Sequence, residues 1–194
     1  MMETREPNAI TRSAGLALAA LWRDRRASMA IEYAFVAPAF IALILASLHT
    51  SLVFVAQQGL ETAAESAARL ILTGQAQTSY SGTTAQQQAD FQAAACAALP
   101  PFLTCNRLYV DVETVSSYAQ AQSMMTTGPK FTYDKNGNVT NTFNYSPGAQ
   151  GSIVVLRLMY LWPTMTGPMG FSLVNSGQSN RLLVATSVMK TEGY

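Results

Sequence analysis

The stretch of sequence that decides the fold reads Arg25-Arg26-Ala27-Ser28-Met29-Ala30-Ile31-Glu32-Tyr33-Ala34-Phe35-Val36-Ala37-Pro38. Basic residues precede it and a long apolar run follows it. One carboxylate, that of Glu32, stands where the apolar run begins. An unpaired carboxylate is costly at the edge of a bilayer, so its presence there calls for a function. We interpret the stretch as a processing and assembly signal for the rest of the chain.

The apolar run from Ala34 to Val55 contains no charged residue. A helix of this length rises about 33 Å, and crossing the hydrocarbon core of a bilayer takes about 20 residues. We therefore predict a transmembrane helix over residues 34–55, with a kink at Pro38 because proline cannot donate a backbone hydrogen bond. The helical spacing of apolar residues continues beyond the span, which predicts one nearly continuous helix over about residues 28–73.

Basic residues set the expected orientation of this helix. Arg23, Arg25 and Arg26 precede the span, whereas the first basic residue after it is Arg69. The N-terminus is therefore expected in the cytoplasm, with the bulk of the chain on the other side of the membrane.

The part of the helix beyond the span is rich in alanine, and small side chains permit close packing. Its partner is either the chain's own domain or a neighbouring subunit, and the sequence leaves both interpretations open.

The composition limits the possible functions. Charged residues make up 12% of the 194 residues, well below the usual quarter, as expected when a large segment avoids water. The net charge of +1 gives no electrostatic support for a nucleic-acid partner. Two cysteines and one histidine, His49, are too few for a closed structural zinc site.

Catalytic motifs are missing from the sequence. It contains no phosphate-cradling glycine loop, no HExxH and no nucleophile elbow. Asp111 and Glu113 share one face of a predicted strand, which we expect to be the exposed face. We therefore expect neither an enzymatic activity nor a cofactor, a metal site or a small-molecule substrate.

The rest of the chain predicts an α+β domain over residues 84–194, after a polar linker over residues 75–83. Its helix is expected to begin at a capping box, Thr84-Ala85-Gln86-Gln87, and to end near Leu99 before two prolines. A small antiparallel sheet of four or five strands should follow, at residues 108–113, 131–145 (a hairpin turning at Asn136-Gly137), 152–162 and 181–190. Residues 116–130 are predicted to form a polar loop.

The two cysteines flank the end of this predicted helix. Cys96 lies in its last turn and Cys105 just after the following loop. In a periplasmic domain an oxidised pair is the natural interpretation, and two free buried thiols are the alternative.

The opening stretch resembles the class III leader of type IV pilin-like proteins, and in particular the TadE-like pseudopilins of tight-adherence (Flp/Tad) pili. The resemblance rests on Ala27-Ser28-Met29-Ala30-Ile31-Glu32-Tyr33 with the apolar residues after it, and continues through the Ala-rich segment to Arg69. It implies that a prepilin peptidase cuts between Ala27 and Ser28, which makes residues 1–27 a cytoplasmic leader. Glu32 then becomes the fifth mature residue, followed by Tyr33. The family usually has Gly before the cut, where this chain has Ala27.

The resemblance also implies a function and partners. The expected function is that of a minor pilin-like component of a Tad/Flp pilus assembly machinery, needed for pilus biogenesis and surface adherence. The expected location is the bacterial inner membrane, with the C-terminal domain in the periplasm. The implied partners are the peptidase, a second pseudopilin, the major pilin and the inner-membrane assembly platform. The alternatives are an unprocessed, signal-anchored periplasmic binding or adaptor protein and, ranked last, a membrane-tethered enzyme.

The spacing of Ser28 and Glu32 supports a cut after Ala27. Ser28 and Glu32 are four residues apart, one turn of a helix. A cut after Ala27 creates an ammonium group at Ser28, which can pair with Glu32 of the same chain or of a neighbour. The alternative is that the Glu32 side chain only extends to the lipid headgroups.

Overall fold

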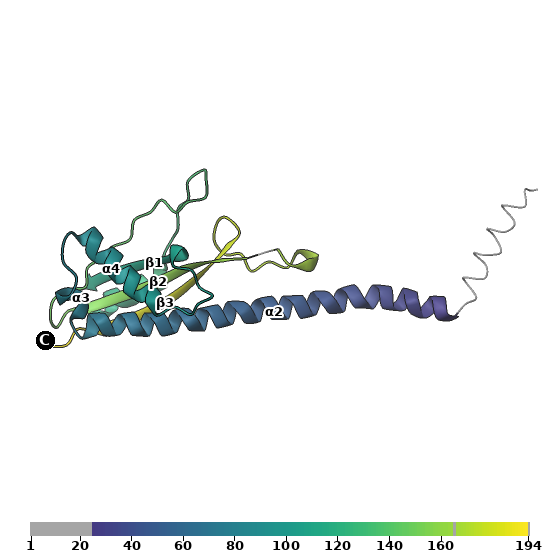
Figure 1. The fold of residues 1–194 in the computed structure, drawn as a ribbon, viewed down its shortest axis with the longest axis horizontal. Coiled ribbons are helices and arrows are strands. Elements are labelled where there is room, and N and C mark those ends of the chain that lie inside the picture. The colour runs from purple at the N-terminus through teal and green to yellow at the C-terminus, as the bar shows by residue number, and fades with distance from the viewer. Residues whose placement is uncertain (1–24, 165, 194) are drawn as a thin grey trace, which may run out of the picture. The chain divides into compact units, whose positions relative to one another are not determined.

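The computed structural model describes residues 25–164 and 166–193 (Figure 1). Most of the predicted leader, residues 1–24, lies outside the described residues. The chain divides into two compact units, Met1–Ser47 and Leu48–Tyr194. A long helix, shorter helices and a three-stranded antiparallel sheet confirm the predicted α+β class.

The long helix α2 spans Arg25–Leu72 and continues through Pro38, close to the predicted limits. The helix is already formed at Arg25, the first described residue, so Ser28 and Glu32 both lie within it in the uncut chain. The helix ends before Gly74, whose φ of 77° is left-handed, a conformation that glycine adopts without strain. A short helix, α3 (Gln75–Thr78), follows at once, within the range expected to be a linker.

One stripe of α2 is buried against the second unit. Its members recur every three or four residues, the spacing of a single helix face, and all are at most 7% exposed: Val53, Ala56, Leu60, Ala63, Ala64, Ala67 and Ile71. The alanine-rich part of the helix therefore packs on the chain's own domain. Phe54 lies outside this stripe and is 67% exposed.

Gly59 shows how close this packing is. A Cβ atom built on Gly59 would lie 2.6 Å from Cγ of Pro100 in the loop after α4. Glycine therefore allows an approach that any larger side chain would block.

The sheet consists of β1 (Leu108–Val115), β2 (Ile153–Pro163) and β3 (Asn180–Lys190), in that order and antiparallel throughout. On one face the strands bury alternate side chains at 2% exposure or less, including Val110, Val112 and Leu156. This face packs in one core with the buried stripe of α2 and with Phe91 of α4. Two short 3₁₀ helices complete the fold, η1 (Cys105–Arg107) and η2 (Pro168–Gly170).

The predicted hairpin around Asn136-Gly137 is present only as a turn. One isolated bridge joins Tyr133 to Val139, and no strand of the sheet forms there. The Asp134 carboxylate accepts hydrogen bonds from the backbone N–H groups of Asn136 and Asn138, each at 2.8 Å. The side-chain and backbone hydrogen bonds from Asn138 lower the pKa of Asp134. Beyond this one bridge the two arms of the turn are not paired, and a two-stranded hairpin that joins no larger sheet is at best marginally stable.

Two helical details differ from the predictions. Helix α4 (Thr84–Ala97) has its capping box one residue earlier, with Thr83 as N-cap and Gln86 at the third position. Helix α5 (Tyr118–Thr127) occupies the range expected to be a polar loop. Only Ala121 of α5 is buried, against Val115 and Val155 on the second face of the sheet. So small an apolar contact leaves no helical periodicity in the sequence.

Candidate functional site

The predicted processing motif lies at the start of α2. The backbone at Ala27 and Ser28 is helical, so Ser28 and Glu32 are one helical turn apart. Glu32 and Tyr33 are both exposed, Tyr33 at 73%. Among the side chains that the structure describes, none forms an ion pair with Glu32. The described side chains thus leave the Glu32 carboxylate without an ionic partner.

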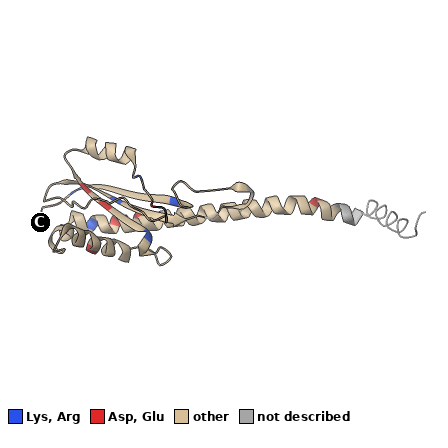
Figure 2. Ribbon diagram, turned by 90° about the horizontal axis from the view of Figure 1, so that it is seen from above, with Lys and Arg blue, Asp and Glu red and all other residues tan. Residues whose placement is uncertain are grey.

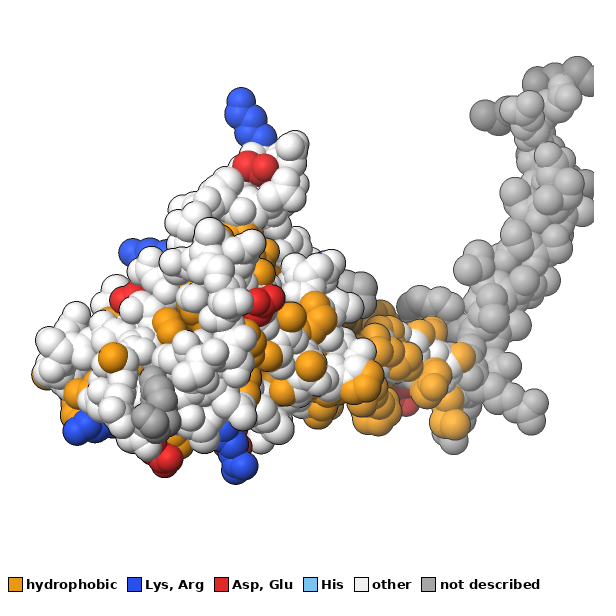
Figure 3. Space-filling model, turned by 60° about the vertical axis from the view of Figure 1, so that its left-hand side comes forward, with side chains coloured by type: hydrophobic (Ala, Val, Ile, Leu, Met, Phe, Trp, Pro, Cys, Tyr) orange, Lys and Arg blue, Asp and Glu red, His pale blue; other side chains and the backbone are white. Residues whose placement is uncertain are grey.

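The helix after Glu32 exposes apolar side chains on every side. Residues 33–55 carry no charge, and Figure 2 shows the uncharged part of α2 in tan. The exposed members gather as an orange surface in Figure 3 and include Phe35, Val36, Phe40, Ile41, Leu43, Leu45, Leu48 and Leu52. Within the described part of the chain, Met29–Leu72 is the one helix long and apolar enough to cross a membrane, by length and composition. A helix that is apolar all round and uncovered suits a lipid environment.

The predicted disulfide is present. Cys96 in the last turn of α4 is bonded to Cys105 in η1, and their Cα atoms are 5.5 Å apart. The bond ties the end of α4 to the start of β1, across the loop that contains Pro100. The confirmed pair is consistent with an oxidising compartment, which is where structural disulfides persist.

Removing the disulfide is expected to lower the free energy of unfolding. Chain entropy predicts a loss of about 2–3 kcal/mol for a loop of this length. The Cys96→Ser/Cys105→Ser double variant and the wild type should be compared by urea unfolding in detergent micelles. Under reducing conditions the two proteins should unfold at the same urea concentration. A wild type that is unaffected by reduction, and no more stable than the double variant, would show that the bond contributes nothing.

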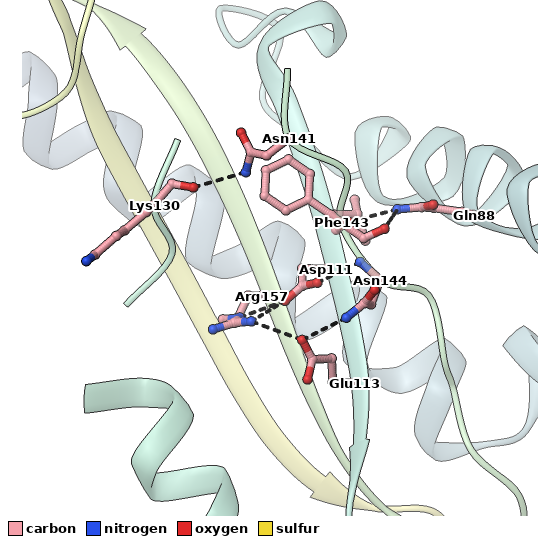
Figure 4. A network of polar contacts seen from close by, with 9 residues as sticks. Gln88, Asp111, Glu113, Lys130, Asn141, Phe143, Asn144 and Arg157 are labelled. Atoms are coloured by element: carbon pink, nitrogen blue, oxygen red, sulfur yellow. Dashed lines mark hydrogen bonds and ion pairs between the residues drawn. The ribbon is translucent and has the colours of Figure 1, made fainter. Parts of the chain in front are cut away.

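Sequence reasoning missed a buried ion pair on the sheet. Asp111 was expected on an exposed face, but it is 3% exposed and contacts the Arg157 guanidinium of β2 (Figure 4). Arg157 Nε donates to Asp111 Oδ2 at 2.8 Å, and Nη2 donates to Glu113 Oε1 at 3.5 Å. The backbone N–H of Asn144 donates to the other Asp111 oxygen at 2.9 Å. The expectation failed because α5 and residues 128–145 cover this face.

The contacts of this ion pair indicate a structural role. It ties β1 to β2 and holds Asn144 against the sheet. A hollow of about 420 Å³ lies beside it, between Met124 of α5 and Lys130, Asn141 and Phe143 of the following segment. No group of His, Cys, Asp and Glu side chains among the described residues could hold a metal ion. One feature of the sequence could have indicated this ion pair. Arg157 is the only charged residue of the 11 in β2, and the other ten are apolar or proline.

Aromatic rings cover the same face nearer the start of β1. Tyr109 lies 5.2 Å from Phe131 and 5.6 Å from Phe143, measured between ring centroids. Phe131 also stacks on Tyr133. Burial, together with the nearby Tyr133, raises the pKa of Tyr109. These contacts hold residues 131–143 on the domain although they form no strand.

The long helix and the α+β domain together define the class of single-helix membrane-anchored proteins. One helix is long and apolar enough to anchor the chain in a membrane, and the C-terminal part of the same helix forms the core of an α+β domain.

Comparison with known families specifies this class further. The family model described as TadE-like protein matches residues 27–69. The match begins at Ala27, beside the predicted cut, and ends at Arg69 on the buried half of α2. It confirms the resemblance to TadE-like proteins for this segment and associates the chain with Tad pilus assembly. No curated protein and no solved structure matches the chain.

Proposed function

We propose that the protein is a minor pilin-like subunit, a pseudopilin, of a Tad/Flp pilus assembly machinery. Its α2 helix anchors it in the bacterial inner membrane, with residues 1–27 in the cytoplasm and the disulfide-bonded domain in the periplasm. A prepilin peptidase removes the leader between Ala27 and Ser28. The subunit then acts in pilus biogenesis and surface adherence, together with a second pseudopilin, the major pilin and the inner-membrane platform.

The observation that carries this proposal is the arrangement at the start of α2. Glu32 stands without an ion-pair partner among the described side chains, one turn after the predicted cut and at the head of an exposed apolar helix. The TadE-like match covers this same segment. A lone carboxylate at the edge of a bilayer is costly, and an ammonium at Ser28 would neutralise it. Processing thus converts an unfavourable charge into one half of an ion pair.

The alternative is an unprocessed periplasmic binding or adaptor protein, and an enzyme is the least supported reading. The hollow beside Arg157 is the best candidate for a ligand site, but both of the carboxylates that line it already contact Arg157. We therefore propose a role in assembly, without catalysis, cofactor or small-molecule substrate.

Deletion of the gene in the cell that produces the protein tests the role in assembly. We expect the deletion strain to lose surface pili, counted by electron microscopy, and to adhere to a surface at one tenth or less of the wild-type level. The wild-type gene supplied in trans should restore both. Normal numbers of pili in the deletion strain would contradict the proposal and favour the adaptor.

A further inference from the structure

A groove lies at the end of the sheet where β2 passes into β3. It encloses about 300 Å³ and is lined by side chains from α2, from the connection between β2 and β3, and from β3 itself: Thr50, Val53, Phe54, Gln57, Leu173, Arg181 and Leu183. All of these residues belong to the second compact unit. Apart from Arg181 the lining is uncharged and mostly apolar. The groove thus combines an apolar wall with a single cation.

The cation in this groove lacks a counter-ion. The Arg181 guanidinium has no carboxylate within ion-pair distance among the described residues. Its Nη1 donates to the carbonyl oxygen of Leu173 at 3.2 Å, and its buried Nε has no acceptor. A half-buried guanidinium with unused donors is unfavourable, because these donors have lost water without gaining an acceptor. An anionic oxygen in the groove would remove that cost.

The position of the groove along α2 identifies the environment that it faces. Thr50 and Gln57 flank Val55, the end of the predicted span, and the helix rise places Thr50 about 7–8 Å below that end. The groove therefore straddles the boundary between the hydrocarbon and the headgroups, where tryptophan rings are enriched and where long arginine side chains near helix ends can reach the headgroups. Trp162 is the cross-strand neighbour of Arg181.

The uncharged surface near the groove also suits the membrane interface. No charged residue occurs from Leu158 to Asn180, a range that includes the whole connection between β2 and β3. Phe54, which lines the groove, is 67% exposed, and Leu52 of α2 and Val174 of the connection are exposed at 57% and 41%. Exposed apolar side chains thus occur both on this part of α2 and on the connection.

We propose that this groove binds a membrane phospholipid, whose phosphate contacts Arg181 and whose acyl chain lies against Val53, Phe54 and Leu173. The bound lipid would hold the domain at a fixed height on the bilayer. The inference rests on α2 as a membrane span and is independent of the role in pilus assembly.

Native mass spectrometry of the full-length protein released from nanodiscs tests the proposal. The nanodiscs contain phosphatidylethanolamine and phosphatidylglycerol at a ratio of 3:1, and the measured quantity is the fraction of protein that retains one phospholipid. Arg181→Gln should lower this fraction at least fivefold, and Arg181→Lys should lower it less. Lys190→Gln removes the same charge from an exposed position at the other end of β3 and should leave the fraction unchanged.

A second variant fills the groove without changing its charge. Leu173→Trp enlarges a half-buried residue of the connection and should also displace the lipid, whereas the circular dichroism spectrum stays that of the wild type. Equal lipid retention by Arg181→Gln, Leu173→Trp and Lys190→Gln would overturn the proposal. It would also be overturned by a dimer that Leu173→Trp dissociates while lipid retention is unchanged, because the occupant would then be a second copy of the chain.

Discussion

Replacing Glu32 with alanine is expected to abolish entry of the protein into pili while the cut before Ser28 still occurs. The carboxylate has no ion-pair partner among the described side chains of the uncut chain, so its removal should leave folding unchanged. In the proposed function, the pair between Glu32 and the new ammonium of Ser28 forms only after the cut. Near the low-dielectric edge of the bilayer such a pair is worth more than the 0–1 kcal/mol typical of a fully exposed pair. Its loss should therefore affect assembly and not processing.

The experiment compares the amount of each variant in sheared pili with the amount in the membrane. Glu32→Gln keeps the size of the side chain and removes its charge, so it should fail in the same way as Glu32→Ala. Glu65→Ala is the matched control, since Glu65 is an exposed carboxylate on the same helix and forms no ion pair with any described side chain. We expect at least a tenfold loss from pili for both Glu32 variants and none for the control. Wild-type incorporation of Glu32→Ala would disprove the pairing between Glu32 and Ser28.

Replacing Arg157 with methionine should destabilise the domain by about 3–5 kcal/mol, because the substitution leaves the buried Asp111 carboxylate without its partner. That is a large share of the 5–15 kcal/mol that stabilises a typical domain. The measurement is chemical unfolding of the full chain in detergent micelles, followed by circular dichroism. Lys190→Met, which removes an exposed cation from β3, should change the free energy of unfolding by no more than about 0.5 kcal/mol.

A double variant separates the charge from the packing. Asp111→Asn/Arg157→Met removes both charges and keeps an oxygen for the N–H of Asn144. It should be more stable than Arg157→Met alone, since no uncompensated charge remains in the interior. If the double variant is less stable than Arg157→Met, the cost comes from lost packing and the electrostatic explanation is wrong.

The sequence was sufficient where a pattern is local and repeated. The apolar span followed from a run without charges, and the helical spacing of apolar residues beyond it predicted that α2 continues to about residue 73. The disulfide followed from two cysteines placed on either side of a short loop. The three strands β1, β2 and β3 followed from apolar and alternating runs close to their observed limits.

The sequence was insufficient where tertiary contacts outweigh local pattern. Asp111 alternates like an exposed residue, and only the coverage by α5 and residues 128–145 buries it. Helix α5 contributes one buried alanine, too little to produce an amphipathic signal. The segment around Asn136-Gly137 carries the turn signal of a hairpin, but aromatic contacts and the Asp134 carboxylate hold it in place of strand pairing.

Ala27 stands before the predicted cut, where TadE-like proteins usually have glycine. Whether the proposed cut occurs depends on how the peptidase accepts this alanine. The backbone is helical from Arg25 through Ala27, so the proposed cut lies in a segment that is helical in the uncut chain. A side chain as small as alanine adds one methyl group to the usual glycine. We expect the cut to occur, and Ala27→Gly to increase its rate.

The mature N-terminus tests the central claim most directly. The protein is expressed in membranes with the prepilin peptidase of the same cell, or with a catalytically inactive form of it, and its mass and N-terminal sequence are determined. The claim predicts a new N-terminus that begins Ser28-Met29-Ala30-Ile31-Glu32 with the active peptidase only. Retention of residues 1–27 with the active peptidase, or a cut at any other bond, would contradict it.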